Sequence, residues 1–251
     1  MPLLLLRRGR KLGGKNIRTR SQALINDDLL IDFPADTYTR FLQNGIKGDE
    51  IAYLLVTHAH ADHLYSGDFA MRASGYSHNK RVPTLKVFCS ANTAKHIGPV
   101  PQGLEVTVLA PYETVELGTY RVTPLPARHM KNGEPFIYII QGDKTILHAH
   151  DTGYFFEEVF AHIEASKLVF DMVSLDCTNC DIPISDEGGH MGFPNVGRVL
   201  DRLAAMGAVT DKTIKYVNHF SHNANPNHAI LEKRAAEYGC LVSYDGCQVE
   251  F

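Results

Sequence analysis

The chain has 251 residues, of which 44% are hydrophobic and 21% are charged. These fractions are close to globular averages, so they exclude a disordered, collagen-like or coiled-coil protein. Residues 1–20 hold seven basic side chains and no acidic one, whereas the rest of the chain holds 18 basic against 28 acidic groups. Because an acidic body repels polyanions, we expect no long nucleic acid as a partner.

In chain order, short apolar runs bounded by turn residues predict strands, and periodic apolar residues predict helices. Asn26-Asp27-Asp28, Gly142-Asp143 and Asp245-Gly246 are typical of hairpin turns. Two groups of strands with helices between them favour an α/β sandwich of sheets with helices outside. The predicted strands are 23–25, 29–31, 51–56, 85–89, 104–109, 119–125, 136–140, 145–147, 168–175, 213–217, 241–244 and a short one at Val249. The predicted helices are 37–44, 154–165, 195–206 and 227–238.

The basic N-terminal arm, residues 1–20, is the least regular part of a chain that otherwise predicts one domain over 1–251. Residues 1–6 are expected to pair with a sheet edge, and residues 7–16 to form a mobile or substrate-facing loop. The apolar run at 3–6 is too short for a signal peptide, and no segment approaches membrane-spanning length. The odd number of cysteines, five, indicates reduced thiols. We therefore expect a cytoplasmic protein with no membrane partner.

The chemical signal is strongest directly after the apolar run that ends at Val56. There the chain reads Thr57-His58-Ala59-His60-Ala61-Asp62-His63, which places four candidate ligands within six residues. Imidazole and carboxylate groups suit zinc and its neighbours in the first transition series. His58 and His60 can point together from an extended segment, while Asp62 and His63 lie beyond the bend. The motif therefore predicts a metal site in a strand-end loop.

This motif resembles that of the metallo-β-lactamase superfamily, and three later residues match in order: His129, Asp151 and His219. The resemblance covers most of the chain from Gln22 and implies an αββα four-layer sandwich with two divalent metal ions. Zinc is expected, although manganese, iron or nickel also suits such ligands. The resemblance implies that His58, His60 and His129 hold one ion, that Asp62, His63 and His219 hold the other, that Asp151 bridges both, and that Asp32 orients a ligand histidine.

Within the superfamily, the sequence is most similar to PhnP-type cyclic phosphodiesterases. The likeness includes Asp176-Cys177, the Gly-rich loop before His190, and His219-x-x-His222. It implies that Asp62, His190 and His222 act in catalysis, with His190 close to the substrate phosphate. The family's usual glycine-rich first strand and the extra cysteine-rich zinc site of PhnP are absent. A cysteine at the Asp151 position would have favoured a true lactamase.

The resemblance predicts a dinuclear metal-dependent hydrolase acting on a small, cyclic phosphodiester through a hydroxide that bridges the metals. Hydrolysis of a carboxylic ester, lactone or thioester is the alternative, since the same metal pair serves both reactions. A non-catalytic metal-binding protein is the option outside enzymes. Cys177-x-x-Cys180 is weak evidence for a redox or zinc site, and His148 and His150 are expected to be framework residues.

Overall fold

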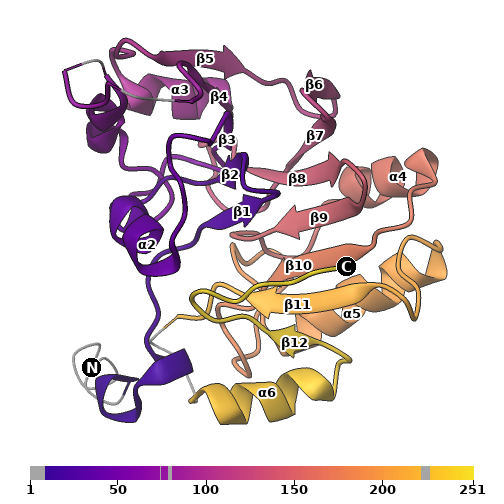
Figure 1. Cartoon of the computed structure of the whole chain (residues 1–251). Coiled ribbons are helices and arrows are strands. Elements are labelled where there is room, and N and C mark those ends of the chain that lie inside the picture. Colours follow the sequence, from indigo (N-terminus) through magenta and orange to yellow (C-terminus); the bar gives the residue numbers. More distant parts are fainter. Residues whose placement is uncertain (1–8, 74, 79–80, 222–226) are drawn as a thin grey trace. The chain divides into compact units, whose positions relative to one another are not determined.

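The computed structural model describes residues 9–73, 75–78, 81–221 and 227–251. The chain forms two compact units, each with one β-sheet and its own helices (Figure 1). Unit 1 comprises Met1–Arg18, Thr114–Met130 and Ile137–Phe251, and unit 2 comprises Thr19–Glu113 and Lys131–Phe136. The α/β class predicted from the sequence is therefore confirmed, whereas the single domain over 1–251 stays a prediction.

Unit 2 contains a five-stranded sheet in which only the first pair of strands is antiparallel. Parallel neighbours require a crossover, and each crossover here contains a helix. The strands, in their order across the sheet, are β1 (Ala23–Ile25), β2 (Leu29–Ile31), β3 (Tyr53–Leu55), β4 (Leu85–Cys89) and β5 (Leu104–Val108). The crossovers hold α2 (Thr37–Asn44), a 3₁₀ helix (Ser66–Arg72) and α3 (Ala91–Ile97).

The hairpin between β1 and β2 sets the register of unit 2. Asn26 and Asp27 are the central residues of a turn that the Asp28 amide closes on the Ile25 carbonyl at 3.3 Å, and both have positive φ, 47° and 66°. β2 then pairs with β3, and the amide of Asp32 donates to the carbonyl of Leu55 at 2.8 Å. Asp32 therefore emerges at the carboxyl edge of the sheet, next to the end of β3. Buried apolar side chains such as Leu54 and Val87 fill the core behind it.

Unit 1 contains a seven-stranded sheet in the order β12-β11-β10-β9-β8-β7-β6. The pairs β6–β7 and β8–β9 are antiparallel, while β9, β10, β11 and β12 run parallel. The strands are β6 (Val115–Leu117), β7 (Tyr120–Pro126), β8 (Phe136–Gln141), β9 (Thr145–Ala149), β10 (Met172–Asp176), β11 (Ile214–Asn218) and β12 (Leu241–Val242). The crossovers of the parallel part are α4 (Glu157–Ser166), α5 (Phe193–Ala205) and α6 (His228–Ala236).

The parallel part of this sheet brings polar side chains together. β9, β10 and β11 are neighbours, so their carboxyl ends lie at one edge. Asp151 follows β9, Asp176 is the last residue of β10, and His219 follows β11. In open α/β sheets, ligands bind beyond such carboxyl ends. The topology of unit 1 therefore positions a polar cluster at this edge.

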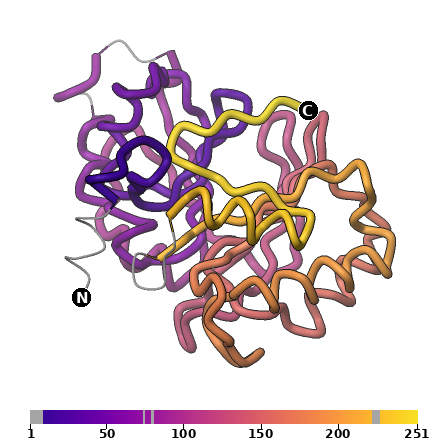
Figure 2. Tube along the Cα trace, turned by 90° about the horizontal axis from the view of Figure 1, so that it is seen from below, coloured from indigo at the N-terminus to yellow at the C-terminus, as the bar shows by residue number. Residues whose placement is uncertain are grey.

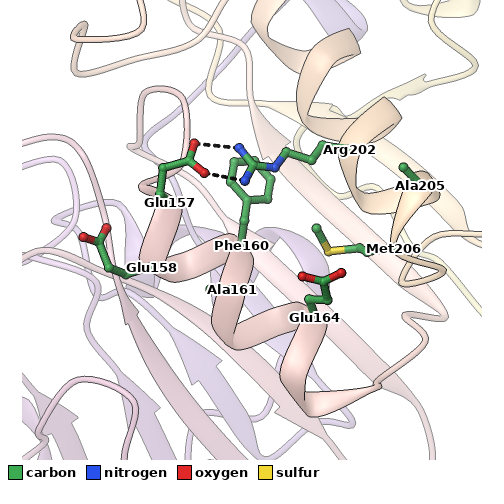
Figure 3. Close-up of a pocket in the computed structure, with 8 residues that line it drawn as sticks. All are labelled: Glu157, Glu158, Phe160, Ala161, Glu164, Arg202, Ala205 and Met206. Atoms are coloured by element: carbon green, nitrogen blue, oxygen red, sulfur yellow. Dashed lines mark hydrogen bonds and ion pairs between the residues drawn. The ribbon is translucent and has the colours of Figure 1, made fainter.

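Helices α4 and α5 pack against each other on unit 1 (Figure 3). The Arg202 guanidinium lies 3.9 Å from the Phe160 ring centroid and makes two hydrogen bonds to Glu157. α5 buries Val196, Val199 and Leu203, whose spacing of three and four residues gives the helix one apolar face. The surface groove between these helices is lined by none of the residues singled out as site residues.

Most predicted elements are confirmed within one or two residues. The helix predicted over 154–165 begins three residues later, at Glu157, and two predicted strands also differ. The strand predicted from Leu168 begins only at Met172, because Lys167 (φ 57°) ends α4 and a connecting segment follows. The prediction of a strand at Val249 is wrong. After a turn at Gly246 the chain runs to Phe251 without regular structure (Figure 2). Neither α3 nor β6 was predicted, and they are only seven and three residues long.

The N-terminal arm differs from its prediction where the structure describes it. The strand expected over residues 1–6 lies outside the described residues, as do residues 7 and 8. Residues 9–12 are helical and Gly14–Asn16 form a 3₁₀ helix, where a loop was expected. Asn16 explains part of this order, because its Oδ1 accepts from the His228 amide at the start of α6. In the described part of the chain, no helix has the length and apolar character needed to cross a membrane.

Candidate metal centre

In unit 2, the loop after β3 carries four of the candidate ligands and is fixed by Thr57. The Thr57 amide donates to Asp32 Oδ1 at 2.8 Å, and its hydroxyl lies 2.9 Å from the same oxygen. Both residues are buried. A carboxylate bound in this way ties the end of β2 to the start of the histidine loop. Sequence reasoning gave Thr57 no role.

Asp32 also orients His63. Its Oδ2 lies 2.6 Å from His63 Nδ1, and both side chains are fully buried. A carboxylate accepts the proton of Nδ1, so the Nε2 atom of His63 keeps its lone pair for a metal ion. That Nε2 lies 3.8 Å from Asp62 Oδ2. Asp32 therefore holds the ring of His63, and the role of His63 as a metal ligand stays a prediction.

His58 and His60 face each other at the start of the loop. His58 Nε2 and His60 Nδ1 lie 2.9 Å apart, and their ring planes meet at 74°. Two ring nitrogens that converge in this way suit a shared ion, because each neutral imidazole can present a lone pair. Asp62 is half exposed at the outer end of the loop, whereas His58 and His63 are buried.

In unit 1, Asp151, Asp176, His190 and His219 each offer a ligand atom, and these atoms all lie within 4.8 Å of one another. His219 Nε2 is 2.7 Å from Asp151 Oδ1, and His190 Nδ1 is 2.8 Å from Asp176 Oδ2. His129 belongs to the same edge, with Nε2 3.4 Å from Asp151 Oδ2. Asp151 thus lies between the Nε2 atoms of two histidines.

The tautomers of these histidines follow from their outer partners. Gly189 O lies 2.9 Å from His129 Nδ1, and a carbonyl can only accept, so Nδ1 carries the proton. Thr178 Oγ1 lies 2.8 Å from His219 Nδ1 and donates its own hydrogen to the His219 carbonyl or to Asp176. His219 Nδ1 is therefore the donor in that contact. In both rings Nε2 keeps its lone pair, on the side of Asp151.

These contacts test whether the residues suit divalent cations. His63, His129 and His219 each have Nδ1 held by an oxygen acceptor and Nε2 available as a donor to a metal. Ligand histidines in metalloproteins are usually held in this way. Asp151 adds a buried carboxylate. The donor sets fit a hard or borderline cation such as zinc or manganese.

Three residues of these groups also have a strained backbone. Asp32, Asp151 and His219 have φ of 64°, 50° and 60°, in the left-handed region that non-glycine residues rarely adopt. Each comes directly or almost directly after a strand, where the chain must turn sharply to project a side chain over the sheet edge. Such strain persists where the surrounding structure enforces it, and it is concentrated at functional sites.

Glycines bring the His190 loop close to the rest of the unit 1 cluster. A Cβ on Gly153 would lie 1.8 Å from the Gly188 carbonyl oxygen, so no other residue fits there without a shift. Gly189 lies against the His129 backbone and ring, where a Cβ would come within 3.3 Å. This loop is therefore packed directly on the segments that carry His129 and Asp151.

Two residues that sequence reasoning did not assign to the site prove central to its geometry, Asp176 and Thr178. Asp176 is fully buried and accepts from the amides of Thr178 and Met191 besides contacting His190. The only available signal was its place at the end of a predicted strand, as part of the Asp176-Cys177 likeness. His222 lies outside the described residues.

The remaining polar motifs belong to the interior. His150 is buried and lies 2.7 Å from Ser174 Oγ, and its ring is 3.9 Å from that of His148. Cys177 and Cys180 are buried free thiols, and the candidate metal groups found among the described residues contain no cysteine. Burial raises the pKa of Cys180 to about 12.

Comparisons with known proteins identify the family and the fold of the chain. A UPF0173 metal-dependent hydrolase of Thermoplasma acidophilum is 32% identical over 118 residues, which cover 44% of this chain and only 48% of that protein. The metallo-beta-lactamase fold protein YhfI of Bacillus subtilis superposes with a TM-score of 0.69 at 15% identity, covering 91% of each chain. A diphosphatase described as a member of the PhnP family gives 0.71 at 19% identity, covering 95% of this chain and 87% of its own. Residues 30–220 match the beta-lactamase superfamily domain, and the chain belongs to that superfamily.

Proposed function

We propose that the protein is a hydrolase that depends on divalent metal ions. The observation that carries this proposal is the common arrangement of His63, His129 and His219, each with Nδ1 held and Nε2 available. The relative from Thermoplasma acidophilum, itself described as a metal-dependent hydrolase, adds support. The proposed ligands of two ions are His58, His60, Asp62, His63, His129, Asp151 and His219.

Divalent ions bound by these residues would supply Lewis-acid chemistry, lowering the pKa of coordinated water and offsetting negative charge on the scissile group. The protein's own part is to hold the ligands. Asp32 and Thr57 fix the loop of unit 2, and Thr178 fixes His219 in unit 1. Zinc or manganese suits the donor set, and the proposal does not depend on which of the two is bound.

The substrate we propose is a small phosphodiester, with a carboxylic ester, lactone or thioester as the second candidate. His190 supports the phosphodiester. Asp176 accepts the proton of its Nδ1 and so orients the ring, and in the protonated ring the far nitrogen can donate to a phosphate or leaving oxygen. His190 is about one quarter exposed, so a substrate can reach it. We assign Asp62 and His222 to catalysis only through the PhnP-type resemblance.

Turnover of bis(p-nitrophenyl) phosphate, p-nitrophenyl acetate and an acyl thioester by the metal-loaded chain tests this proposal. We expect the phosphodiester to be hydrolysed fastest, with activity lost on chelation and restored by zinc or manganese. Faster hydrolysis of the acetate or thioester would favour the second candidate. Metal binding close to two ions per chain with no turnover of any of the three would favour the non-catalytic metal-binding protein.

A further inference from the structure

Arg18 is a partly buried cation that the proposed metal centre does not use. It lies in unit 1, with its guanidinium carbon 5.1 Å from the ring centroid of Phe220. Phe220 is itself buried and directly follows the proposed ligand His219. Arg18 therefore lies beside the segment that carries a proposed metal ligand, on the chain's own basic N-terminal arm.

The hydrogen-bonding state of this guanidinium is unusual. Its Nε and Nη2 atoms are shielded from solvent, and neither has a hydrogen-bond partner among the described residues. Burial lowers the pKa of Arg18, and the nearby Asp245 and Cys180 only partly oppose that effect. A guanidinium stays protonated in proteins, so this edge is charged and desolvated. Leaving charged donors unsatisfied costs free energy, which an incoming acceptor would recover.

The identity of the two atoms points to the chemistry of that acceptor. Nε and Nη2 form one side of the guanidinium fork, where two N–H bonds run parallel. Such an edge matches two oxygens of a single phosphate or carboxylate group, and bidentate pairs of this kind are strong and directional.

The segment that precedes Arg18 makes contacts with α6 and with Tyr244 at the surface. Lys15 makes an exposed ion pair with Glu232 and lies 4.4 Å from the Tyr244 ring centroid, and Asn16 makes one hydrogen bond to the His228 amide. Exposed ion pairs of this kind contribute little stability. The Lys15–Glu232 pair therefore adds little to the free energy that holds this segment against α6.

We propose that Arg18 is an oxyanion-binding residue whose Nε–Nη2 edge takes two oxygens of a phosphate or carboxylate group beside His219. This assignment rests on the proposed function, under which the bound group is an anionic substituent of the substrate or the phosphate of the product. The site would favour substrates that carry such a group over uncharged analogues.

Binding of inorganic phosphate and of acetate to the metal-loaded full chain, followed by calorimetric titration and by melting temperature, tests the proposal. Arg18→Gln should weaken the binding of phosphate about tenfold to a hundredfold. It should also remove the part of the phosphate-induced rise in melting temperature that comes from the Arg18 guanidinium. Arg18→Lys keeps the charge but lacks the paired N–H groups, so we expect an intermediate loss. Arg121→Gln, which removes an exposed arginine paired with Glu116, is the matched control and should bind phosphate as the unmodified chain does.

The two anions distinguish the sources of the ligand. A preference for phosphate would indicate a phosphate group of substrate or product, and a preference for acetate a carboxylate. Without added anion, Arg18→Gln should melt at the same temperature or higher, because it removes a buried unsatisfied charge. Unchanged phosphate binding in both Arg18 variants would overturn the proposal and leave the metal ions as the binding site. Because the titration needs no turnover, it can fail or succeed independently of the proposed hydrolase activity.

Discussion

The two groups of candidate ligands are built in opposite ways. In unit 2 the ligands are consecutive, since His58, His60, Asp62 and His63 all lie in one loop after β3. In unit 1 they are scattered over 90 residues, from His129 to His219: His129 follows β7, while Asp151 and His219 follow the parallel strands β9 and β11. A contiguous loop can be recognised by its spacing alone. A scattered group depends on strand order and register, which no local pattern contains.

The largest effect should follow from the residue on which the scattered group converges. Asp151→Ala removes the carboxylate that lies between His129 Nε2 and His219 Nε2, at 3.4 and 2.7 Å. We expect metal content to fall below one ion per chain and hydrolysis to fall to background, as measured by elemental analysis and by turnover. Asp143→Ala, in an exposed turn of the same unit, is the control. Full metal content in Asp151→Ala would show that the two groups do not depend on this residue.

The contiguous loop should be more tolerant, because its outer support can be weakened without removing a ligand. Asp32→Asn keeps the shape of the side chain but loses the charge that holds His63 Nδ1 at 2.6 Å. Loss of such an outer partner typically weakens metal affinity 10- to 100-fold. Competition with a chromophoric chelator measures this affinity.

Asp27→Asn is the matched control for that change, since Asp27 lies exposed in the β1–β2 turn with φ of 66°, a conformation that asparagine tolerates well. An Asp32→Asn variant with the metal affinity of the control would mean that the Asp32–His63 contact does not support metal binding.

Replacing His190 tests whether this residue binds metal or acts on the substrate. Because its Nδ1 is engaged by Asp176, we expect His190→Ala to keep both metals and to lose about 10²-fold in phosphodiester turnover, the usual scale for a general acid. Metal content and turnover are measured on the same preparation, with the exposed His96→Ala as control. Loss of metal in parallel with rate would make His190 a ligand, as its place in the unit 1 group also allows.

The contrast between the groups also explains how much of the fold and of the candidate site could be predicted from the sequence alone. The loop at 57–63 and the β1–β2 hairpin depend on neighbours in the chain, and both could be predicted from spacing and turn residues. His129, Asp151 and His219 were identified only through a family resemblance. Asp176 and Thr178 gained no role because their contacts arise from the pairing of β10 with β11 and from the fold of the loop at 186–190.

The smallest expected effect concerns thiols, which lie outside both ligand groups. Burial raises the pKa of Cys89, Cys180 and Cys240 to about 12, and that of Cys177 well above its ordinary value. At pH 8 these groups are almost entirely protonated and shielded, and the thiolate is the reactive form. We therefore expect only the half-buried Cys247 to react quickly with a thiol reagent in the folded protein, and all five to react after denaturation.

The same pKa shifts predict a pH dependence of stability. The folded state holds these four protons at pH values where unfolded thiols, with a pKa near 9, release them. The unfolded state then binds fewer protons, so the free energy of unfolding should fall as the pH rises above about 9. Urea denaturation at pH 8 and pH 10 measures this free energy of unfolding. Mass spectrometry of the labelled protein, with Cys247→Ser as control, measures the reactivity of each thiol. Rapid labelling of Cys177 or Cys180 in the folded Cys247→Ser variant would show that this pair is accessible and would reopen a redox role for it.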